Sequence, residues 1–267
     1  MPDTKKSSVL EKPVTRKKDK ALSGARSYKI VKSNDLIQKA RFNLSVQEQK
    51  IILYLISKLK PDDDKSTTII FTYKEFCSVC GININGKNYA DIKKAIQNLA
   101  DKSLWIKFDN GKDVLMRWIQ RAIGDDKLGT MLIRFDELLE PYLFDLKKNF
   151  TQYEFYNILA MKSQYSIRLY EILRSYEYKH GVEFEINNLK EQLAATHYDK
   201  YKDFRCRVLD VAIKEILDYS DINVTYEAIK EKNKYSRIIF TVYRKKDLDE
   251  NFATWKRIIE SIGDYSN

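Results

Sequence analysis

An internal repeat is the feature of this sequence that most constrains its fold. The stretch "IILYLISK" at 51–58 is followed 116 residues later by "IRLYEILR", in which Ile, Leu, Tyr, Ile and a terminal cation keep their positions. In the same way, "AIQNL" at 95–99 is followed 117 residues later by "AIKEI". Similarity at a nearly constant spacing indicates one structural unit that occurs twice in tandem.

The first copy opens with a predicted helix. Ser45 and Glu48 form a capping box, apolar residues follow at helical spacing, and Pro61 ends the run. "TTIIFTYKEF" predicts a short strand that turns into a helix near Tyr73. A third helix is predicted in "NYADIKKAIQNL", with Asn88 as its N-cap.

Strands complete this copy, and the second copy repeats the order. Strand patterns flank the Asn110-Gly111 hairpin turn, and a second turn is predicted at 124–127. In the second copy, the helix in "SQYSIRLYEILRSYEYKHG" is predicted to end just before Gly181. It is followed by a strand in "VEFEI", a helix in "NNLKEQLAA", a third helix within 200–217, and two strands in "INVTYEAIKEKNKYSRIIFTVYRK".

This element order is that of a winged helix, a helix-turn-helix variant in which the third helix enters the major groove and a β-hairpin wing touches flanking backbone. The predicted fold is α+β, mainly helical, with two tandem winged-helix domains at 28–147 and 148–246. Residues 1–27 are predicted to be a flexible basic tail and 247–267 a C-terminal tail. The basic tail is either a solubilising leader or a non-specific phosphate-binding arm.

The overall charge indicates an anionic partner. The 267 residues carry a formal net charge of +10 and a sequence pI of about 9.2, which favours nucleic acid or an anionic membrane surface. A membrane span would need about 18–20 consecutive apolar residues, and no such run occurs. The N-terminus also lacks the apolar region of a signal peptide, so we expect a cytoplasmic protein.

Cysteine usage gives no support for a metal site. Cys77, Cys80 and Cys206 form an odd and sparse set, which suits a reducing compartment. Cys77 and Cys80 have the spacing of a metal or redox pair, but there is no second pair, and neither histidine is near in sequence. We expect these two to be small buried residues, and we predict no metal or cofactor.

The predicted third helix of the second unit, within "KYKDFRCRVLDVAIKEIL" at 200–217, has an unusually basic start. Cations are mildly unfavourable there, because the helix macrodipole favours anions at its N-terminus. Arg205 and Arg207 suit bidentate contacts with guanine. Lys200 and Lys202 suit phosphate contacts, which set register without reading sequence. The alternative is a solvated basic face, the usual explanation of a charge run.

Other cations fall on related elements. They lie later on the same helix, on the predicted wing, and around the third helix of the first unit. The predicted DNA-binding residues are Lys200, Lys202, Arg205, Arg207 and Lys214 on the helix, Lys230, Lys232, Lys234 and Arg237 on the wing, and Lys87, Lys93 and Lys94 in the first unit.

"KDFRCRVLDVAIKEI", with the strand, basic loop and "IIFTVYRKK" that follow, resembles the second winged-helix domain of plasmid replication initiators, the Rep proteins of theta-replicating plasmids. "FNLSVQEQKIILYLIS" and "FTYKEFCSVCGI" resemble the opening helix and the strand–helix turn of the family's first domain. The resemblance covers residues 28–246. One departure is the wing segment "EKNKYSR", which has no Gly where the family tends to a Gly-containing hairpin.

The resemblance implies a function. It implies a monomer that binds iterons, the short direct repeats of an origin, in double-stranded DNA, with the second domain making the main major-groove contacts. Origin opening and recruitment of a host helicase or initiator are implied as well. A dimer that represses the protein's own gene is common in the family, so a monomer–dimer equilibrium is expected.

Other function classes fit less well. A rolling-circle nickase needs a His-rich metal site, but His180 and His197 are 17 positions apart, and an ATPase needs a phosphate loop that the eight glycines do not form. We therefore predict no enzyme. A stronger rival is a tandem winged-helix repressor with no initiator role, for which an inverted-repeat target would be diagnostic. RNA binding would need exposed aromatic residues, whereas Tyr165, Tyr170 and Phe204 fall at core positions.

Overall fold

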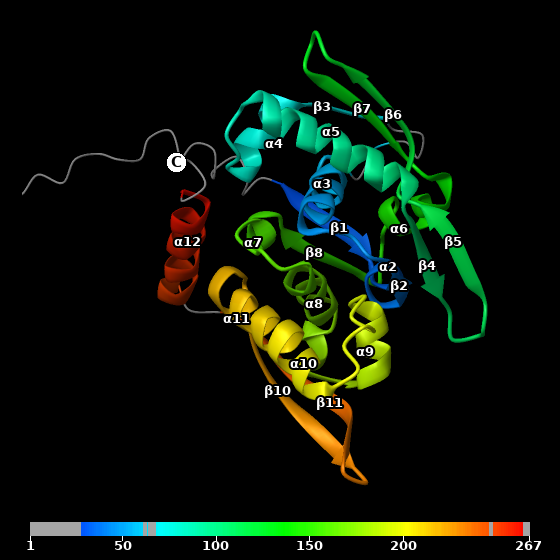
Figure 1. Ribbon diagram of the computed structural model, residues 1–267, viewed down its shortest axis with the longest axis vertical. Coiled ribbons are helices and arrows are strands. Elements are labelled where there is room, and N and C mark those ends of the chain that lie inside the picture. The colour runs from blue at the N-terminus through cyan, green and yellow to red at the C-terminus, as the bar shows by residue number, and fades with distance from the viewer. Residues whose placement is uncertain (1–27, 61–62, 64–67, 246–247, 264–267) are drawn as a thin grey trace, which may run out of the picture.

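The computed structural model describes residues 28–60, 63, 68–245 and 248–263 (Figure 1). Two groups of elements lie one above the other and are joined at β1 (Lys29–Ser33) and β8 (Phe150–Glu154). These strands form an antiparallel pair in which Lys29 faces Glu154 and Ser33 faces Phe150. The predicted boundary between 147 and 148 therefore separates two strands of one sheet.

The first unit follows the predicted order through α3 (Val46–Ser57), β3 (Ile69–Thr72), α4 (Tyr73–Cys80) and α5 (Gly86–Asp101). The capping box of α3 is confirmed, since Ser45 and Glu48 exchange hydrogen bonds between side chain and backbone. The prediction of Asn88 as the cap of α5 is wrong. Asn85 is the N-cap, because its side chain accepts a hydrogen bond from the Asn88 N–H and so starts the helix at Gly86.

Two hairpins complete the first unit. β4 (Ser103–Lys107) and β5 (Asp113–Arg117) pair around the predicted turn, and β4 also pairs with β2 (Ala40–Arg41), in the order β2-β4-β5. β6 (Ile119–Asp125) and β7 (Thr130–Phe135) form a second sheet with β3, in the order β3-β7-β6. The turn between them lies at 126–129 rather than at 124–127. Gly124 belongs to β6, and Gly129 supplies the positive φ of +62° that this turn needs.

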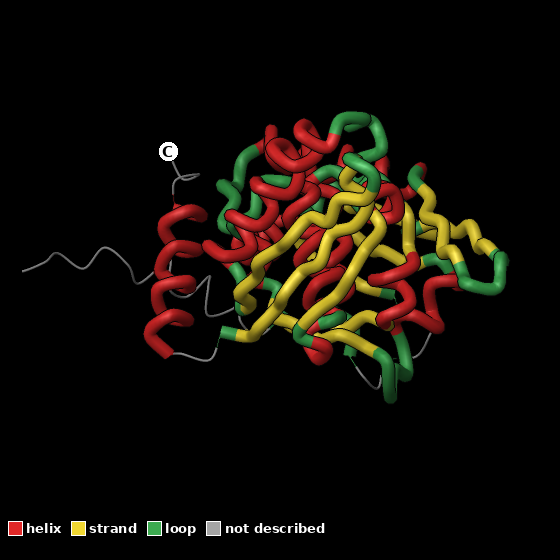
Figure 2. Tube along the Cα trace, turned by 90° about the horizontal axis from the view of Figure 1, so that it is seen from below, coloured by secondary structure: helices red, strands yellow, loops and turns green. Residues whose placement is uncertain are grey.

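The second unit has the same order. α8 (Gln164–Ser175), β9 (Gly181–Glu185) and α9 (Ile186–Gln192) precede a third helix made of α10 (Tyr201–Phe204), a π-helical turn η3 (Arg205–Leu209) and α11 (Asp210–Tyr219). β10 (Ile222–Glu231) and β11 (Lys234–Arg244) then form the sheet β10-β11-β9, which Figure 2 shows with the helices behind it.

The end of α8 was predicted too late. The helix ends at Ser175, and a 3-10 turn, η2 (Glu177–Lys179), follows it. His180 caps this turn with a φ of +57°, so that Gly181 begins β9 instead of ending α8.

Several elements were not predicted, and one lies in the segment expected to be a C-terminal tail. Three residues of α12 (Leu248–Gly263) spaced four apart, Thr254, Ile258 and Ile262, are buried on one face. α12 packs on α11, and its Ile262 reaches Gly81 of the first unit, where a Cβ would lie 1.9 Å from Ile262 Cγ2. The other elements that were not predicted are β1, β2, β8, η2, α2 (Asn34–Lys39), η1 (Glu137–Leu139), α6 (Glu140–Leu143) and α7 (Tyr156–Leu159).

A buried charge network joins the two units. Lys32 Nζ of β1 lies 2.7 Å from Glu171 Oε1 of α8, and both side chains are 2% exposed. Tyr153 donates a second hydrogen bond to the same carboxylate at 2.6 Å, and its burial raises its pKa well above the usual value. Arg168 of α8, also buried, donates to the carbonyl of Ala40 at 2.9 Å. Since buried charges need partners, this network fixes how the two units meet.

Across the part of the chain that the structure describes, no helix has both the length and the apolar character needed to cross a membrane.

Candidate nucleic-acid interface

The third helix of the second unit separates an apolar side from a cationic side. Phe204, Val208, Ala212 and Ile216, each four residues from the next, are fully buried. The predicted cations are all exposed, with Lys200 at the extended N-cap and the others within the helix: Lys200, Lys202, Arg205, Arg207 and Lys214. The start of the helix therefore presents these cations to solvent, where they can meet an anion.

Arg205 and Arg207 both lie in the π-helical turn η3, a kind of turn that is frequent at functional sites. Arg205 Nε lies 3.6 Å from Asp210 Oδ2, and Arg205 Nη2 lies 3.9 Å from Cys206 Sγ. Asp210 accepts a hydrogen bond at 2.7 Å from the hydroxyl of Tyr226 on β10. Arg207 makes no ion pair with any residue that the structure describes. The two arginines are thus held differently, although they are two positions apart.

The wing of the second unit forms a tight hairpin without glycine. Lys232 and Asn233, between β10 and β11, have φ values of +46° and +67°. Positive φ at both central residues is the geometry of a type I′ turn, and Asn tolerates it better than most residues. The wing therefore keeps a hairpin despite the missing Gly, and Lys232 and Lys234 are exposed at its tip.

Aromatic contacts attach this wing to the start of the helix. The rings of Tyr201 and Tyr235 stack with their centroids 4.0 Å apart at an interplanar angle of 26°. Lys230 Nζ lies 4.7 Å from the centroid of the Tyr235 ring, a cation–π distance. The helix start and the wing therefore form one continuous surface.

Arg237 differs from the other predicted wing cations. Its guanidinium lies 2.5 Å from Glu183 of β9 and 2.7 Å from Glu231 of β10. These two carboxylates raise the pKa of Arg237. The residue connects the three strands of its sheet, so a phosphate would have to compete with two carboxylates for it.

In the first unit, Lys87 and Lys94 are exposed on α5, and Lys93 is tied to the β6–β7 turn. Lys93 Nζ lies 2.9 Å from Asp126 Oδ1, and the Tyr89 hydroxyl donates to the same oxygen at 2.7 Å. Lys93 and Tyr89 together lower the pKa of Asp126. The third helix of this unit is therefore also fixed to its wing.

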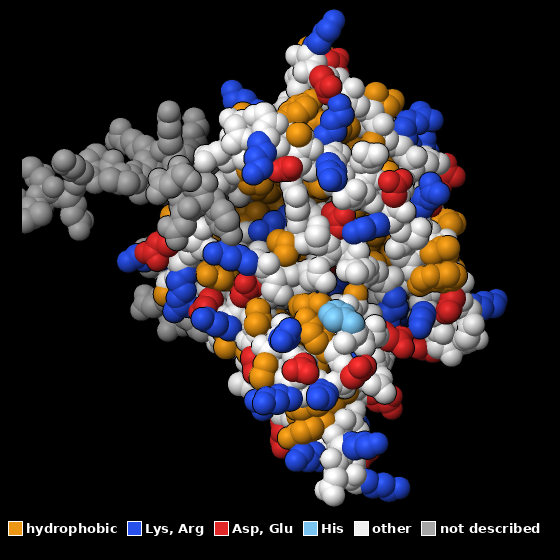
Figure 3. All heavy atoms as spheres, viewed as in Figure 1, with side chains coloured by type: hydrophobic (Ala, Val, Ile, Leu, Met, Phe, Trp, Pro, Cys, Tyr) orange, Lys and Arg blue, Asp and Glu red, His pale blue; other side chains and the backbone are white. Residues whose placement is uncertain are grey.

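The tyrosines that join helices to wings were missed in the sequence, because aromatic residues were assigned to the core. For Tyr201, Tyr226 and Tyr235 the signal in the sequence was their position beside cations at the helix start and along the wing strands. On the face shown in Figure 3, Lys and Arg side chains occur over the upper unit and around the lower hairpin. The two wings, β6–β7 and β10–β11, project from opposite ends of the molecule (Figure 1).

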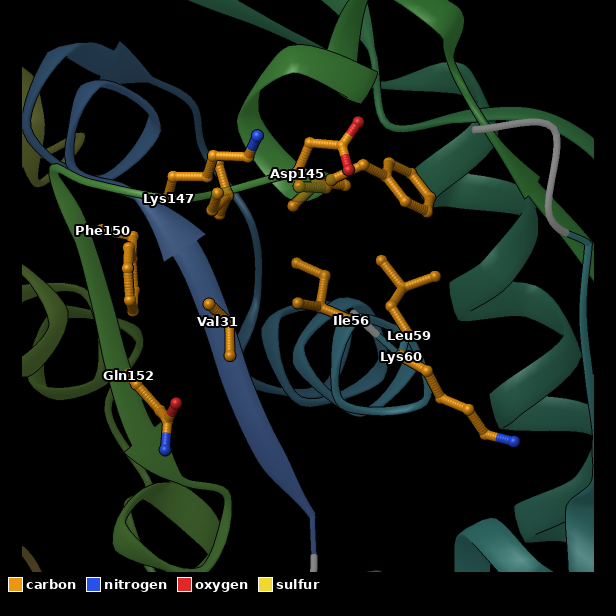
Figure 4. A pocket seen from close by; sticks show the side chains of 11 residues that line it. Val31, Ile56, Leu59, Lys60, Asp145, Lys147, Phe150 and Gln152 are labelled. Atoms are coloured by element: carbon orange, nitrogen blue, oxygen red, sulfur yellow. The ribbon is translucent and has the colours of Figure 1, made fainter. Parts of the chain in front are cut away.

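Other parts of the described chain offer no comparable site. A hollow of about 320 Å³ lies between β1, the end of α3 and the segment 143–152 (Figure 4), and its lining is mostly apolar. Cys77 and Cys80 are buried free cysteines of α4, and burial raises the pKa of Cys80 to about 12, so it stays a thiol at neutral pH. The described residues contain no group of three or more His, Cys, Asp or Glu side chains placed to hold a metal.

Comparison with protein families identifies both units. Residues 29–174 match the family described as "Initiator Replication protein, WH1", and residues 185–242 match "Initiator Rep protein, WH2". The protein belongs to the family of initiator replication proteins. The fold prediction is confirmed, since WH1 and WH2 are its two tandem winged-helix domains, and α12 lies beyond both matched ranges.

Individual proteins agree with this assignment. The initiator chain is 32% identical to the PI protein of Escherichia coli over an alignment of 146 residues, and the match covers 49% of this chain and 44% of that protein. The match thus spans less than half of the relative's length. A crystal structure of the Pi initiator protein in complex with iteron DNA has a TM-score of 0.68 and 19% identity. That comparison covers 83% of this chain and 99% of the other, and it shows a shared fold.

A structure of domains 2 and 3 of RctB is a looser match. It covers 80% of this chain and 88% of that chain, with 16% identity and a TM-score of 0.43.

Proposed function

We propose that the protein is a plasmid replication initiator that binds direct repeats, or iterons, in double-stranded DNA. The observation that carries the proposal is the group of exposed cations on the first two turns of the third helix, beside a wing attached to that helix. Arg205 and Arg207 are the candidates for reading base edges, whereas Lys200, Lys202 and the wing lysines are the candidates for holding phosphates. Membership of the initiator family and the similarity to the Pi protein, whose structure includes iteron DNA, support it.

In this mechanism the second domain places its third helix in a major groove, and the first domain places α5 in another groove of the same duplex. Each phosphate that a Lys or Arg neutralises releases counterions, so log K should fall by about 0.9 per phosphate for each tenfold rise in salt. Sequence preference, in contrast, should depend on the arginines. No step of this binding requires the protein to catalyse a reaction or to hold a cofactor.

The steps that follow DNA binding are proposed only because the protein belongs to the initiator family. Monomers bound at neighbouring repeats would strain an adjacent segment of the origin and recruit a host helicase or initiator. A dimer of the protein would repress its own gene. The site of action would be the cytoplasm, because a bacterial plasmid lies there.

A tandem winged-helix repressor without an initiator role is the alternative function. The orientation of the target separates the two, since head-to-tail monomers suit direct repeats and a two-fold dimer suits an inverted repeat.

Fluorescence anisotropy tests the proposal. The protein is titrated with repeats from its own replicon and with a shuffled duplex of equal composition, each at two salt concentrations. A preference for the repeats of about 10³-fold or more that persists at the higher salt is expected of a specific reader. Equal binding that vanishes with salt would contradict the proposal. A second repeat in direct rather than inverted orientation should then favour joint binding.

A further inference from the structure

We propose that Asp210 and Tyr226 are positioning residues that hold Arg205 in the orientation in which it reads DNA. The inference rests on the proposed function and adds two residues to it. Neither residue is a cation, so neither was a candidate when the interface was predicted from charge.

The geometry forms a relay from the wing to the helix. The Tyr226 hydroxyl donates to Asp210 Oδ1 at 2.7 Å, and Asp210 Oδ2 lies 3.6 Å from Arg205 Nε. The Tyr226 ring packs near the buried Phe240, with centroids 6.0 Å apart, which anchors it to the core. Burial and Asp210 raise the pKa of Tyr226, so its hydroxyl remains a donor at neutral pH.

Two simpler roles for Asp210 fit poorly. A carboxylate on a DNA-facing helix repels phosphates, so Asp210 does not serve affinity. An acidic residue can stabilise a helix N-terminus, where backbone N–H groups are free. Asp210 begins α11, but η3 and α10 continue the helix before it, and the Asp210 N–H already donates to the Arg205 carbonyl. Orientation of Arg205 is the role that remains.

The side of the guanidinium that Asp210 engages decides what Arg205 can offer to DNA. With Nε directed to the carboxylate at 3.6 Å, the edge formed by Nη1 and Nη2 is the far end of the guanidinium, where Nη2 contacts Cys206 Sγ, a weak acceptor, at 3.9 Å. That edge is the one suited to a bidentate contact with guanine O6 and N7. Arg205 and Asp210 are each 48% exposed, so without the carboxylate the long side chain would sample many rotamers and pay the cost of ordering them on binding.

The test uses the full chain and a duplex that the protein itself selects from a random library. Competition binding against every single-base-pair variant of that duplex gives a preference profile for the parent, Arg205→Ala, Asp210→Asn and Tyr226→Phe. Arg205→Ala should lose about 5- to 150-fold discrimination at one base pair. Asp210→Asn and Tyr226→Phe should lose discrimination at that same base pair and at no other.

The matched control is Asp203→Asn, which makes the same charge change about two turns earlier on the helix. Both Asn variants should bind a shuffled duplex more tightly than the parent, because each removes a negative charge from the DNA-facing helix. Only Asp210→Asn should flatten the profile. In the Arg205→Ala background, Tyr226→Phe should cause no further loss at the affected base pair, which a general loosening of the wing would not predict.

The outcomes separate this inference from the proposed function. If the parent selects no preferred duplex, the proposed function fails and the inference fails with it. If the parent has a profile that Asp210→Asn and Tyr226→Phe leave intact, only the positioning role is overturned. A profile unchanged by Arg205→Ala overturns it as well, because Arg205 would then read no base.

Discussion

In both winged-helix units, a tyrosine, an aspartate and a cation connect the third helix to the wing. The units differ in which of these side chains come from the helix and which from the wing. In the first unit, Tyr89 and Lys93 lie on α5 and reach Asp126 in the wing turn. In the second unit, Asp210 and a cation lie on the helix, and the tyrosine comes from the wing strand. The first arrangement directs the cation toward the wing, whereas the second keeps Arg205 on the helix that we assign to the groove.

This difference leads us to expect different contributions of the two units to DNA binding. Lys93 forms a solvent-exposed pair with Asp126 of the wing turn, and its ammonium is a point charge, which suits attachment to backbone more than base reading. Arg205 has a planar guanidinium with two terminal nitrogens and, in our proposal, is oriented by Asp210, which suits base reading. We therefore expect the second unit to carry most sequence preference and the first to carry affinity.

A second contrast lies at the first helix of each unit. The N-terminus of α3 is capped by Glu48, three residues after Ser45. The N-terminus of α8 has Ser163 as its cap but no glutamate three residues later in the sequence. Instead, Glu215 of α11 accepts hydrogen bonds from the N–H groups of Lys162 and Ser163 at 3.0 and 3.1 Å. Equivalent helix ends thus use a carboxylate from the same turn in one unit and from a distant helix in the other.

The largest expected effect is on stability and comes from breaking the buried Lys32–Glu171 ion pair between the two units. Lys32→Met leaves Glu171 buried without its cation, and we expect the free energy of unfolding to fall by about 3–5 kcal/mol. Urea unfolding monitored by circular dichroism measures this loss of stability. The double variant Lys32→Met with Glu171→Leu should recover only part of the loss, because it removes the unpaired carboxylate but leaves the buried Arg168 without the nearby charge of Glu171. A Lys32→Met protein with the parent's midpoint would show that the junction does not hold the units together.

The next effect concerns sequence preference. Removing Arg205 and Arg207 together should reduce discrimination between repeat and shuffled duplexes by about 1–3 kcal/mol for each arginine that reads a base. Removing Lys93 and Lys94 should weaken binding to both duplexes alike and flatten the salt dependence. Anisotropy at two salt concentrations compares the variants, with Lys200→Ala as a phosphate-contact control that should behave like the lysine pair. A double-arginine variant with full preference would reverse the assignment of the two units.

A smaller effect is expected on the pH dependence of stability, which should differ between the Glu48 cap of α3 and the Glu215 contact at α8. Burial alone would raise the pKa of Glu48, but Lys102 and the backbone of Ser45 outweigh it and hold the pKa below its ordinary value. A carboxylate with a lowered pKa adds stability above the unfolded-state pKa and loses it as the pH falls through the folded-state pKa. Glu48→Gln should therefore cost about 1.5–3 kcal/mol at pH 7, the range for hydrogen bonds to charged groups.

The difference between Glu48→Gln and the parent should narrow below about pH 4.5, the ordinary value for Glu. Urea midpoints at several pH values test this. Both Gln variants keep an oxygen that can accept from a helix start, but Glu48→Gln also weakens the 2.7 Å ion pair with Lys102, so Glu215→Gln should cost less at neutral pH. A constant gap between Glu48→Gln and the parent from pH 7 to pH 3 would contradict the lowered pKa.

The smallest effect is expected at Asp126. Its contact with Lys93 is solvent-exposed, so Asp126→Asn should leave the urea midpoint unchanged within error. It should also leave the base-preference profile unchanged, whereas Asp210→Asn should flatten one position of it. If both substitutions altered the profile equally, the contrast between the two units would disappear.

Much of the fold could be predicted because the decisive signals are local. The Ser45–Glu48 box, the strand–helix turn at Tyr73 and the Asn110-Gly111 hairpin each depend on residues a few positions apart. The predictions were wrong where two nearby residues could play the same structural role. Asn85 and Asn88 can both cap a helix, and either Gly124 or Gly129 could have marked a turn. The candidate cations were also visible in the sequence, because exposure follows from a helix whose opposite side is apolar.

The sequence alone determined the repeated unit, its element order and the basic start of the second unit's third helix. Those features depend on contacts within a turn or a hairpin, where the chain itself sets the spacing. Only the tertiary structure decided which side chains meet over longer separations: Lys32 with Glu171, 139 residues apart, Lys162 with Glu215, 53 apart, and Tyr226 with Asp210, 16 apart. Periodicity gives no information on such pairs, because any exposed or buried position of the right charge could serve until packing brings one partner within hydrogen-bonding distance.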